Sequence, residues 1–501
     1  MTSHAFTTTP PRAPSRRLAL AVLCAGSLMI ILDGSIVTVA LPVIQRDLGF
    51  SSANLTWIVN AYLIGFGGLL LLAGRLGDLV GRKRVFVVGL VLFTAASMLC
   101  GVSTSQGMLI AARLVQGVGG ALTAAVSLGI IVTLFPEPRG RGRAIAAFSF
   151  VGAAGASIGQ VLGGFLTQAA GWNWIFFINL PIGVAAVVLA VRILRPERGL
   201  GLAAGADALG ALLVTVGMML GIFAIVGTGG DGRGTGRALA TAALAVALLA
   251  ASVVRLATAA RPLLPLRMFR SRTVSGANLV QLLMVGAMFS FQVLIALYMQ
   301  QVLGYGAAAT GLAMLPAAAA IGTVSLGFSA RLNARFGERP MLLAGLALLV
   351  AAIGLLTRLP VDAAYAAHLL PTMLLAGGFG LAISAVTTLG MSAATAGDAG
   401  IASGLFNTTA QIGSALGVAV LSTLAAARTE GLAAAGQDRA AALTGGFQAA
   451  FGVGAALLVA ALVVAATVLR NPTTPARPDA GGAGGDGDAE GAREAASTGA
   501  A

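Results

Sequence analysis

The chain has 501 residues, of which 57% are hydrophobic and 10% charged, and its mean hydropathy is +0.93. Soluble domains carry about 25% charged residues, and no single core could hide so much apolar surface, so lipid must be the solvent for much of this chain. The formal net charge of +14 does not indicate a nucleic-acid partner, because the Lys and Arg residues form short clusters between apolar runs, as membrane topology signals do.

Residues that bind metals or form disulfides are too few and too scattered to make such a site. Cys24 and Cys100 both lie inside apolar runs, and His4 and His368 are far apart in the sequence, so we expect no disulfide, no metal site and no bound cofactor. There is no G-x-x-x-x-G-K-[ST] phosphate-binding loop and no nucleophile paired with a base. The sequence therefore argues against an enzyme and against an ATP-driven pump.

Fourteen apolar stretches are long enough to cross a bilayer, which takes about 20 helical residues. They lie near 18–43, 54–73, 85–104, 107–134, 144–168, 174–194, 206–228, 237–256, 274–299, 309–330, 341–358, 367–391, 401–424 and 446–469. With the N-terminus in the cytoplasm, most of the 31 Lys and Arg residues fall on cytoplasmic segments. We therefore predict a multi-pass protein of the inner (cytoplasmic) membrane with both termini in the cytoplasm, and with its longest external loop at 425–445.

The two halves of the chain echo each other. GRLGDLVGRKR (74–84) follows the second predicted span and ARLNARFGERP (330–340) follows the tenth, and the same interval separates the first and ninth spans. Repeated halves with a substrate site between them are typical of transporters. We predict an all-α membrane fold with these parts: a cytoplasmic tail (1–17), a six-helix bundle (18–194), a linker with two extra helices (195–273), a second six-helix bundle (274–469) and a disordered cytoplasmic tail (470–501).

The first predicted span carries a carboxylate, Asp33, within LMIILDGSIVTVALP, and the fourth carries Arg113. An Arg inside a span costs about 2.5–3.5 kcal/mol on insertion scales, so it needs a partner. Asp33 is the only acid deep in any predicted span, so the two are paired by elimination. Burial disfavours a charged carboxylate and a nearby guanidinium favours it. Such a site can exchange a proton when its access or the Arg distance changes; the alternative is a permanent ion pair that only holds helices together.

The stretch GRLGDLVGRKR resembles motif A of the major facilitator superfamily. Its glycines allow a tight turn between the second and third spans, and its cations anchor that turn at the cytoplasmic surface. Asp78 is expected to cap a helix or to pair with an Arg across the half as a latch; the alternative is a topology anchor alone. In the second half Ala334 replaces this acid. The residues proposed as a conformational switch are Gly74, Asp78, Gly81, Arg82 and Lys83.

Further stretches extend this resemblance. LIAARLVQGVGGA (109–121), centred on Arg113, Gln116 and Gly117, resembles motif B of the same superfamily, and LDGSIVTVALP resembles the first-span motif of drug/proton antiporters. GAAGASIGQVLGG (152–164) resembles the antiporter motif C, except that Gln160 replaces its proline. Glycines four apart let another helix approach closely, so this face has either a gating or a packing role. Its residues are Gly155, Gly159, Gln160, Gly163 and Gly164.

Landmarks in later spans cover nearly the rest of the chain. WNWIFFINLPIG (172–183), YMQQVLGYGAAATGLAMLP (298–316) and GIASGLFNTTAQIGSALGVAV (400–420) are similar to those of fourteen-span drug exporters. The resemblance spans about residues 15–470 and points to the fourteen-span drug/proton antiporter family, the EmrB/QacA type. Polar residues inside spans are candidates for a substrate cavity, although hydrogen bonding between helices is the commoner use of each. These candidates are Trp57, Asn60, Asn278, Gln281, Gln292, Gln300, Asn407 and Gln411.

The resemblance implies a proton-coupled antiporter that exports drugs or antibiotics by alternating access, with proton coupling at Asp33 and Arg113. Its partners would be a drug-like small molecule, protons and the lipid bilayer, its energy source would be the proton-motive force, and it would be a monomer. One alternative is an exporter of a single endogenous metabolite, and another is a proton symporter. A membrane sensor is disfavoured because the loops and tails leave no room for an output domain.

Overall fold

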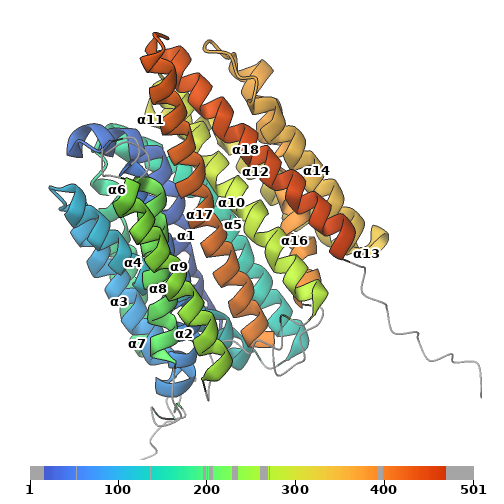
Figure 1. Ribbon diagram of the computed structural model, residues 1–501. Coiled ribbons are helices and arrows are strands. Elements are labelled where there is room, and N and C mark those ends of the chain that lie inside the picture. Colours follow the sequence, from blue (N-terminus) through green and yellow to red (C-terminus); the bar gives the residue numbers. More distant parts are fainter. Residues whose placement is uncertain are drawn as a thin grey trace, which may run out of the picture. The chain divides into compact units, whose positions relative to one another are not determined.

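Helices are the only regular secondary structure in the part of the chain that the structure describes (Figure 1). The computed structural model describes residues 16–51, 54–135, 137–195, 199, 201, 207–227, 235–259, 269, 271–391 and 399–469. The predicted C-terminal tail (470–501) and all but two residues of the predicted N-terminal tail (1–17) lie outside these ranges.

Seven helices make up the region of the first predicted bundle. They are α1 (Arg16–Leu48), α2 (Trp57–Val80), α3 (Arg82–Gly101), α4 (Gln106–Leu134), α5 (Pro138–Ala169), α6 (Trp174–Phe177) and α7 (Asn179–Ile193). α4 packs against both α2 and α3, and α1 packs along α5. Local signals define several ends: Ser105 caps α4 by accepting the Met108 N–H, and Gly81, at φ 107°, makes the turn from α2 to α3.

Two helices in the region predicted as the linker pack on each other. α8 (Ala208–Gly227) and α9 (Thr235–Thr258) form this pair, and α8 also contacts α2 and α17 (Ala399–Ala434) (Figure 1). Asp207 links the start of α8 to the end of α9. Its Oδ1 accepts hydrogen bonds from the Gly210 N–H of α8 and from the Arg255 Nε–H of α9. The linker also reaches the turn after α2, where Gly201 donates its N–H to the Leu79 carbonyl.

The region of the second predicted bundle contains more interrupted helices than that of the first. Besides α17, it consists of α10 (Arg272–Gln301), α11 (Ala307–Ala313), α12 (Leu315–Thr323), α13 (Ser329–Phe336), α14 (Glu338–Leu356), α15 (Leu370–Leu375), α16 (Gly378–Met391) and α18 (Arg439–Val468). π-helical turns at Val324–Phe328 and Tyr365–Leu369 interrupt the tenth and twelfth predicted spans. Both predicted spans also contain a proline, Pro316 or Pro371, which cannot donate a backbone hydrogen bond.

Helical segments lie over every one of the fourteen predicted spans, but fewer helices meet a strict length and hydropathy test. Among the described residues, ten helices are long and apolar enough to cross a membrane, or eleven if the two parts of α2, bent by 49°, count as one span. α8 and the α11–α12 segment contribute shorter apolar stretches, at Leu212–Ile225 and Ala307–Thr323. The chain is therefore an all-helical, multi-pass membrane protein, and the number fourteen stays a prediction.

The prediction that residues 425–445 form a long loop is wrong. α17 continues to Ala434 and α18 begins at Arg439, so only four residues connect them. The segment LAAARTEGLAAA is rich in alanine, the residue with the highest helix propensity, and therefore extends the helix beyond its apolar part. Gly436 turns the chain at φ 86°, and the Asp438 carboxylate caps α18 by accepting the N–H groups of Ala440 and Ala441.

Three glycines place α2 at the junction of other helices. A Cβ atom on Gly65 would lie 2.5 Å from the Leu114 carbonyl oxygen of α4, one on Gly67 2.5 Å from the Gln411 Cβ of α17, and one on Gly68 2.5 Å from the Thr215 Oγ1 of α8. Contacts this short leave no space for a side chain. α2 therefore touches α4, α17 and α8 through three glycine positions.

We predict that Gly65→Val destabilises the protein, because the new side chain meets backbone of α4 that cannot rotate away; overpacking of this kind costs about 1–3 kcal/mol. The measurement is the thermal midpoint of the detergent-solubilised protein, followed by size-exclusion chromatography. Gly354→Val is the matched control, since a Cβ at Gly354 meets nothing within 4 Å. Equal midpoints for the two variants would contradict the close approach of α2 and α4.

Candidate functional site

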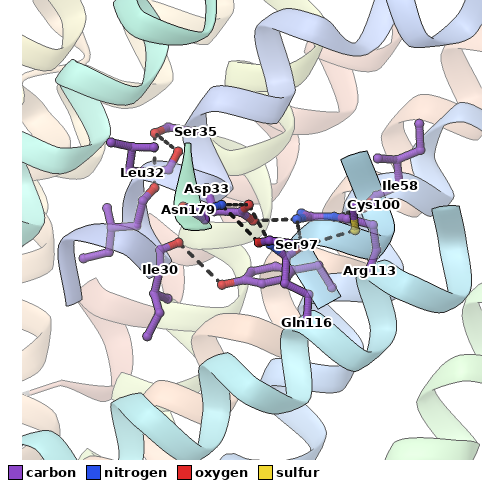
Figure 2. A network of polar contacts seen from close by, with 12 residues as sticks. Ile30, Leu32, Asp33, Ser35, Ile58, Ser97, Cys100, Arg113, Gln116 and Asn179 are labelled. Atoms are coloured by element: carbon purple, nitrogen blue, oxygen red, sulfur yellow. Dashed lines mark hydrogen bonds and ion pairs between the residues drawn. The ribbon is translucent and has the colours of Figure 1, made fainter. Parts of the chain in front are cut away.

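The centre of the site is a buried ion pair between α1 and α4. Arg113 Nη1 donates to Asp33 Oδ2 at 2.5 Å, and the two side chains are 1% and 0% exposed (Figure 2). The contact predicted between these residues is therefore present. Arg113 also donates from Nε to the Ile58 carbonyl of α2 at 2.9 Å and from Nη1 to Gln116 Oε1 at 2.6 Å. The guanidinium thus connects three elements through one side chain.

Aromatic rings enclose the guanidinium on its remaining sides. The Arg113 Cζ lies 4.4 Å from the centre of the Tyr62 ring and 5.8 Å from that of Phe176. A cation over the face of an aromatic ring is attracted by the ring quadrupole, and more strongly where water is excluded. The Tyr62 hydroxyl in turn donates to the Ile30 carbonyl of α1 at 3.5 Å. α2 therefore supports both partners of the ion pair.

Amide side chains occupy the other oxygen of the carboxylate. Asp33 Oδ1 accepts from Gln116 Nε2 at 2.8 Å and from Asn179 Nδ2 at 3.1 Å (Figure 2). Both amides also donate to the Ser97 hydroxyl of α3, at 2.5 Å from Gln116 and 3.1 Å from Asn179. Asp33 therefore has three hydrogen-bond donors around it, drawn from α4 and α7, and the unprotonated carboxylate accepts from all of them.

Helix spacing explains part of this convergence. Arg113 and Gln116 are three residues apart, so they lie on one face of α4. Gly117 on that face packs against the Tyr62 carbonyl of α2 with no room for a Cβ. The resulting closeness of α2 and α4 lets Arg113 reach the Ile58 carbonyl. Ser97 and Asn179 were not predicted as site residues; a polar residue within the apolar stretch WIFFINLPIG was the signal for Asn179.

The motif A residues lie at the turn between α2 and α3. Arg82 pairs with Asp78 at 3.2 Å on an exposed surface, and it also donates to the Gly129 carbonyl and the Thr133 hydroxyl of α4. Lys83 Nζ donates to the Val191 carbonyl of α7 at 2.7 Å. The ion pair that Asp78 makes is thus local to its own turn. Gly74 has no atom within 4 Å of an ideal Cβ, and a switching role for this group stays a prediction.

The motif C glycines bring α5 against helices of both bundles. Gly155, Gly159 and Gly163 face α1, and a Cβ on Gly163 would lie 2.7 Å from the Ile36 carbonyl oxygen. Gly164 faces the Ala307 carbonyl of α11 still more closely, and Gly311 of α11 packs on the backbone of Gln160. These contacts are those of a packing surface, while a gating role stays a prediction. Gln160 is buried, and its Oε1 has no hydrogen-bond partner among the described residues.

Several predicted cavity residues bond or pack between helices. The Trp57 ring lies 6.1 Å from the Phe223 ring of α8. Asn278 of α10 donates to the Val274 carbonyl and accepts from Thr409 of α17 at 2.9 Å. Gln300 at the end of α10 donates to the Val39 carbonyl of α1 at 3.0 Å. Gln411 packs against Gly67.

Other predicted cavity residues have free polar atoms or exposed positions. Asn60 is fully buried, and in the described part of the chain neither atom of its amide has a hydrogen-bond partner. Gln281 is buried with its Oε1 in the same condition. Gln292 is partly buried and Asn407 is exposed. Contact with a substrate stays a prediction for all eight cavity candidates.

Related proteins have names that refer to antibiotic resistance or export. The chain is 36% identical to the puromycin resistance protein pur8 of Streptomyces alboniger, covering 83% of each chain. It is 37% identical to the cephamycin export protein CmcT of Amycolatopsis lactamdurans, covering 82% of this chain and 85% of that one. It is 34% identical to the tetracenomycin C resistance and export protein of Streptomyces glaucescens, covering 82% and 76%.

Solved transporter structures share the fold at low sequence identity. A bacterial homologue of the human lysosomal transporter Spinster, in an inward-facing and unoccupied conformation, aligns with a TM-score of 0.65 at 16% identity, covering 93% of this chain and all of that one. An auto-inhibited peptide transporter of the POT family aligns with a TM-score of 0.66 at 16% identity, covering 92% and 99%. The family model described as the Major Facilitator Superfamily matches residues 23–418. The chain belongs to the major facilitator superfamily and is a transporter, not an enzyme.

Proposed function

We propose that this transporter exports antibiotics or other drug-like molecules across the cytoplasmic membrane in exchange for protons, by alternating access. The names of the related proteins support the substrate class. The observation that carries the proton coupling is the buried ion pair of Asp33 and Arg113. An ionisable residue within the membrane is costly to keep there and typically belongs to a transport pathway or a proton relay.

The geometry suggests how a proton changes the site. Protonation of Asp33 removes the charge that holds the Arg113 guanidinium, while the Ile58 carbonyl, Gln116 Oε1 and the Tyr62 ring keep three contacts to that cation. The link between α1 and α4 is then weakened without leaving Arg113 unpartnered. In the proposed cycle, the protonated form favours return of the empty protein to the inward-facing state, and release of the proton to the cytoplasm accompanies drug loading.

The state of the present structure fits the loading step. Gln300 and Gln301 at the end of α10 hydrogen-bond to the Val39 carbonyl and to Gln45 at the end of α1, and Gly164 of α5 packs on α11. In the predicted topology all of these contacts lie at the external ends of the helices. They close the external side of the proposed pathway, as required for a protein that accepts its substrate from the cytoplasm.

The energetics are adequate for export. Moving one elementary charge through 100 mV releases about 2.3 kcal/mol, and each tenfold concentration ratio costs about 1.4 kcal/mol. One proton per cycle would therefore sustain roughly a fifty-fold drug gradient. We further propose a monomer with fourteen spans, cytoplasmic termini and α8–α9 as the two added helices.

Asp33→Asn should abolish coupling while leaving the protein in the membrane, because the amide cannot exchange a proton at any physiological pH. The measurement uses inside-out vesicles energised by respiration: the wild type should accumulate a substrate such as puromycin until a protonophore is added, and substrate should release protons from the lumen. The variant should show neither effect.

The matched control for this test is Asp362→Asn, which makes the same chemical change at an exposed position and should transport normally. Uphill accumulation by Asp33→Asn at the wild-type level would show that Asp33 is structural. A panel of cationic, anionic and neutral compounds then separates the alternatives: a broad spectrum supports multidrug export, one compound supports a dedicated exporter, and co-transport with protons supports symport.

Arg113→Ala should reduce antiport and move its pH profile to higher pH. Without the guanidinium the charged carboxylate loses its counter-ion, and a nearby opposite charge is what favours the charged form of a carboxylate. Arg358→Ala, at an exposed position, is the control, and both profiles are measured as substrate-induced proton flux in proteoliposomes. A profile with an unchanged midpoint would contradict an electrostatic role for Arg113.

A further inference from the structure

Asn179 is held at a break between two helices, beside the ion pair. α6 ends at Phe177 and α7 begins at Asn179, whose side chain is fully buried. Its Nδ2 donates to Asp33 Oδ1 and to the Ser97 Oγ, both at 3.1 Å. Its Oδ1 is buried and has no hydrogen-bond partner in the described part of the chain. Next to the carboxylate, the Asn179 amide nitrogen therefore donates two hydrogen bonds, while the amide oxygen accepts none from the described residues.

The surroundings of Asp33 suit only its unprotonated form. Every neighbour that hydrogen-bonds to it acts as a donor: Arg113, Gln116 and Asn179. A protonated carboxyl adds an O–H group that needs an acceptor, and a buried donor without one is destabilising. Gln116 Oε1 already accepts from Arg113 and from the Cys100 thiol. The Asn179 Oδ1 is the buried acceptor near Asp33 that lacks a partner.

A half-turn of the Asn179 amide about its terminal bond would exchange its oxygen and nitrogen. The oxygen would then take the present place of Nδ2, 3.1 Å from both Asp33 Oδ1 and the Ser97 Oγ. There it can accept from the Asp33 O–H and from the Ser97 O–H. The two amide groups have nearly the same size, and this torsion is broad, so no helix has to move. In the turned orientation the NH2 group takes the place where Oδ1 now lacks a partner, so among the described residues the amide has one unpartnered group in each orientation.

We propose that Asn179 is a positioning residue that hydrogen-bonds to Asp33 in both protonation states, by turning its side-chain amide when the proton arrives or leaves. The proposal rests on the proposed function in one respect, since it takes Asp33 as the group that exchanges the proton. It assigns to α7 a part in proton exchange that the ion pair of α1 and α4 does not include.

The other titratable groups near Asp33 already have hydrogen-bond partners of their own. The charged or titratable side chains that face it are Arg113 of α4, Tyr62 of α2 and Cys100 of α3. The Tyr62 hydroxyl donates to Ile30 and the Cys100 thiol to Gln116. α5, α10 and α11 also pack on α1, and among their described residues no charged side chain hydrogen-bonds to Asp33. Asn179 is the neutral partner from α7.

Infrared spectroscopy of the purified full-length protein tests the proposal without relying on transport. A pH titration should show the C=O stretch of protonated Asp33, identified as the band that Asp33→Asn removes. Asn179→Leu has a similar volume and can neither donate nor accept. We expect it to move this band to higher frequency, because the carboxyl loses its hydrogen bond, and to shift the titration midpoint only slightly, because both protonation states lose a partner.

Two results would overturn the proposal. If Asn179 only donated to the carboxylate, Asn179→Leu would leave the band in place and raise the midpoint by about one pH unit or more, the size expected for losing a hydrogen bond to a charged group. The control Asn278→Leu, which alters an amide bonded to Val274 and Thr409 instead, should change neither quantity. If Asn179→Leu does not fold, a wild-type band at the frequency of a carboxyl free of hydrogen bonds contradicts the proposal by itself.

Failure of this proposal differs from failure of the proposed function. Should Asp33→Asn still accumulate drug while the wild-type band titrates and moves in Asn179→Leu, the antiport mechanism is wrong and the role of Asn179 at Asp33 stands. Should no Asp33 band appear at any pH at which the protein is stable, Asp33 does not exchange a proton, and the role of Asn179 is overturned.

Discussion

The buried ion pair of Asp33 and Arg113 constrains how the helices around it pack. Neither Asp33 nor Arg113 could remain buried alone, because an isolated ion in a low-dielectric interior is far more costly than a paired one. Their contact requires α1 and α4 to meet near the middle of the bundle, and the remaining donors and lone pairs require polar groups from α2, α3 and α7. Five helices therefore contribute to one polar network around the ion pair.

Glycine surfaces make that convergence possible. Gly117 lets α4 approach the backbone of α2, and Gly159 and Gly163 let α5 approach α1. In a bilayer, close backbone packing replaces the hydrophobic effect as the main attraction between helices. The same device serves between the repeated halves, at Gly67 against α17 and Gly164 against α11. Surfaces without side chains can separate and meet again with little repacking, which suits the alternating access proposed for this transporter.

Much of this architecture was predictable. Helical segments lie over each span that hydropathy predicted. The echo of GRLGDLVGRKR and ARLNARFGERP predicts repeated halves, which stays a prediction. Elimination found the contact of Asp33 with Arg113, because few charged residues enter the apolar stretches and opposite charges must neutralise each other. The loop predicted at 425–445 was an error, because an alanine-rich segment extends α17 past its apolar part. Asn179 was missed because a single amide in a span has many ordinary uses.

The sequence by itself predicted a helical membrane transporter that resembles the major facilitator superfamily, with Asp33 and Arg113 deep inside apolar stretches, since composition, hydropathy and motif spacing are properties of consecutive residues. Only the tertiary structure decided which amides surround Asp33, that Arg113 lies over the Tyr62 ring, and that the Asn179 oxygen has no hydrogen-bond partner among the described residues. Those facts depend on the rotation and depth of α2, α4 and α7 relative to α1. Packing between helices sets both, and no single helix encodes them.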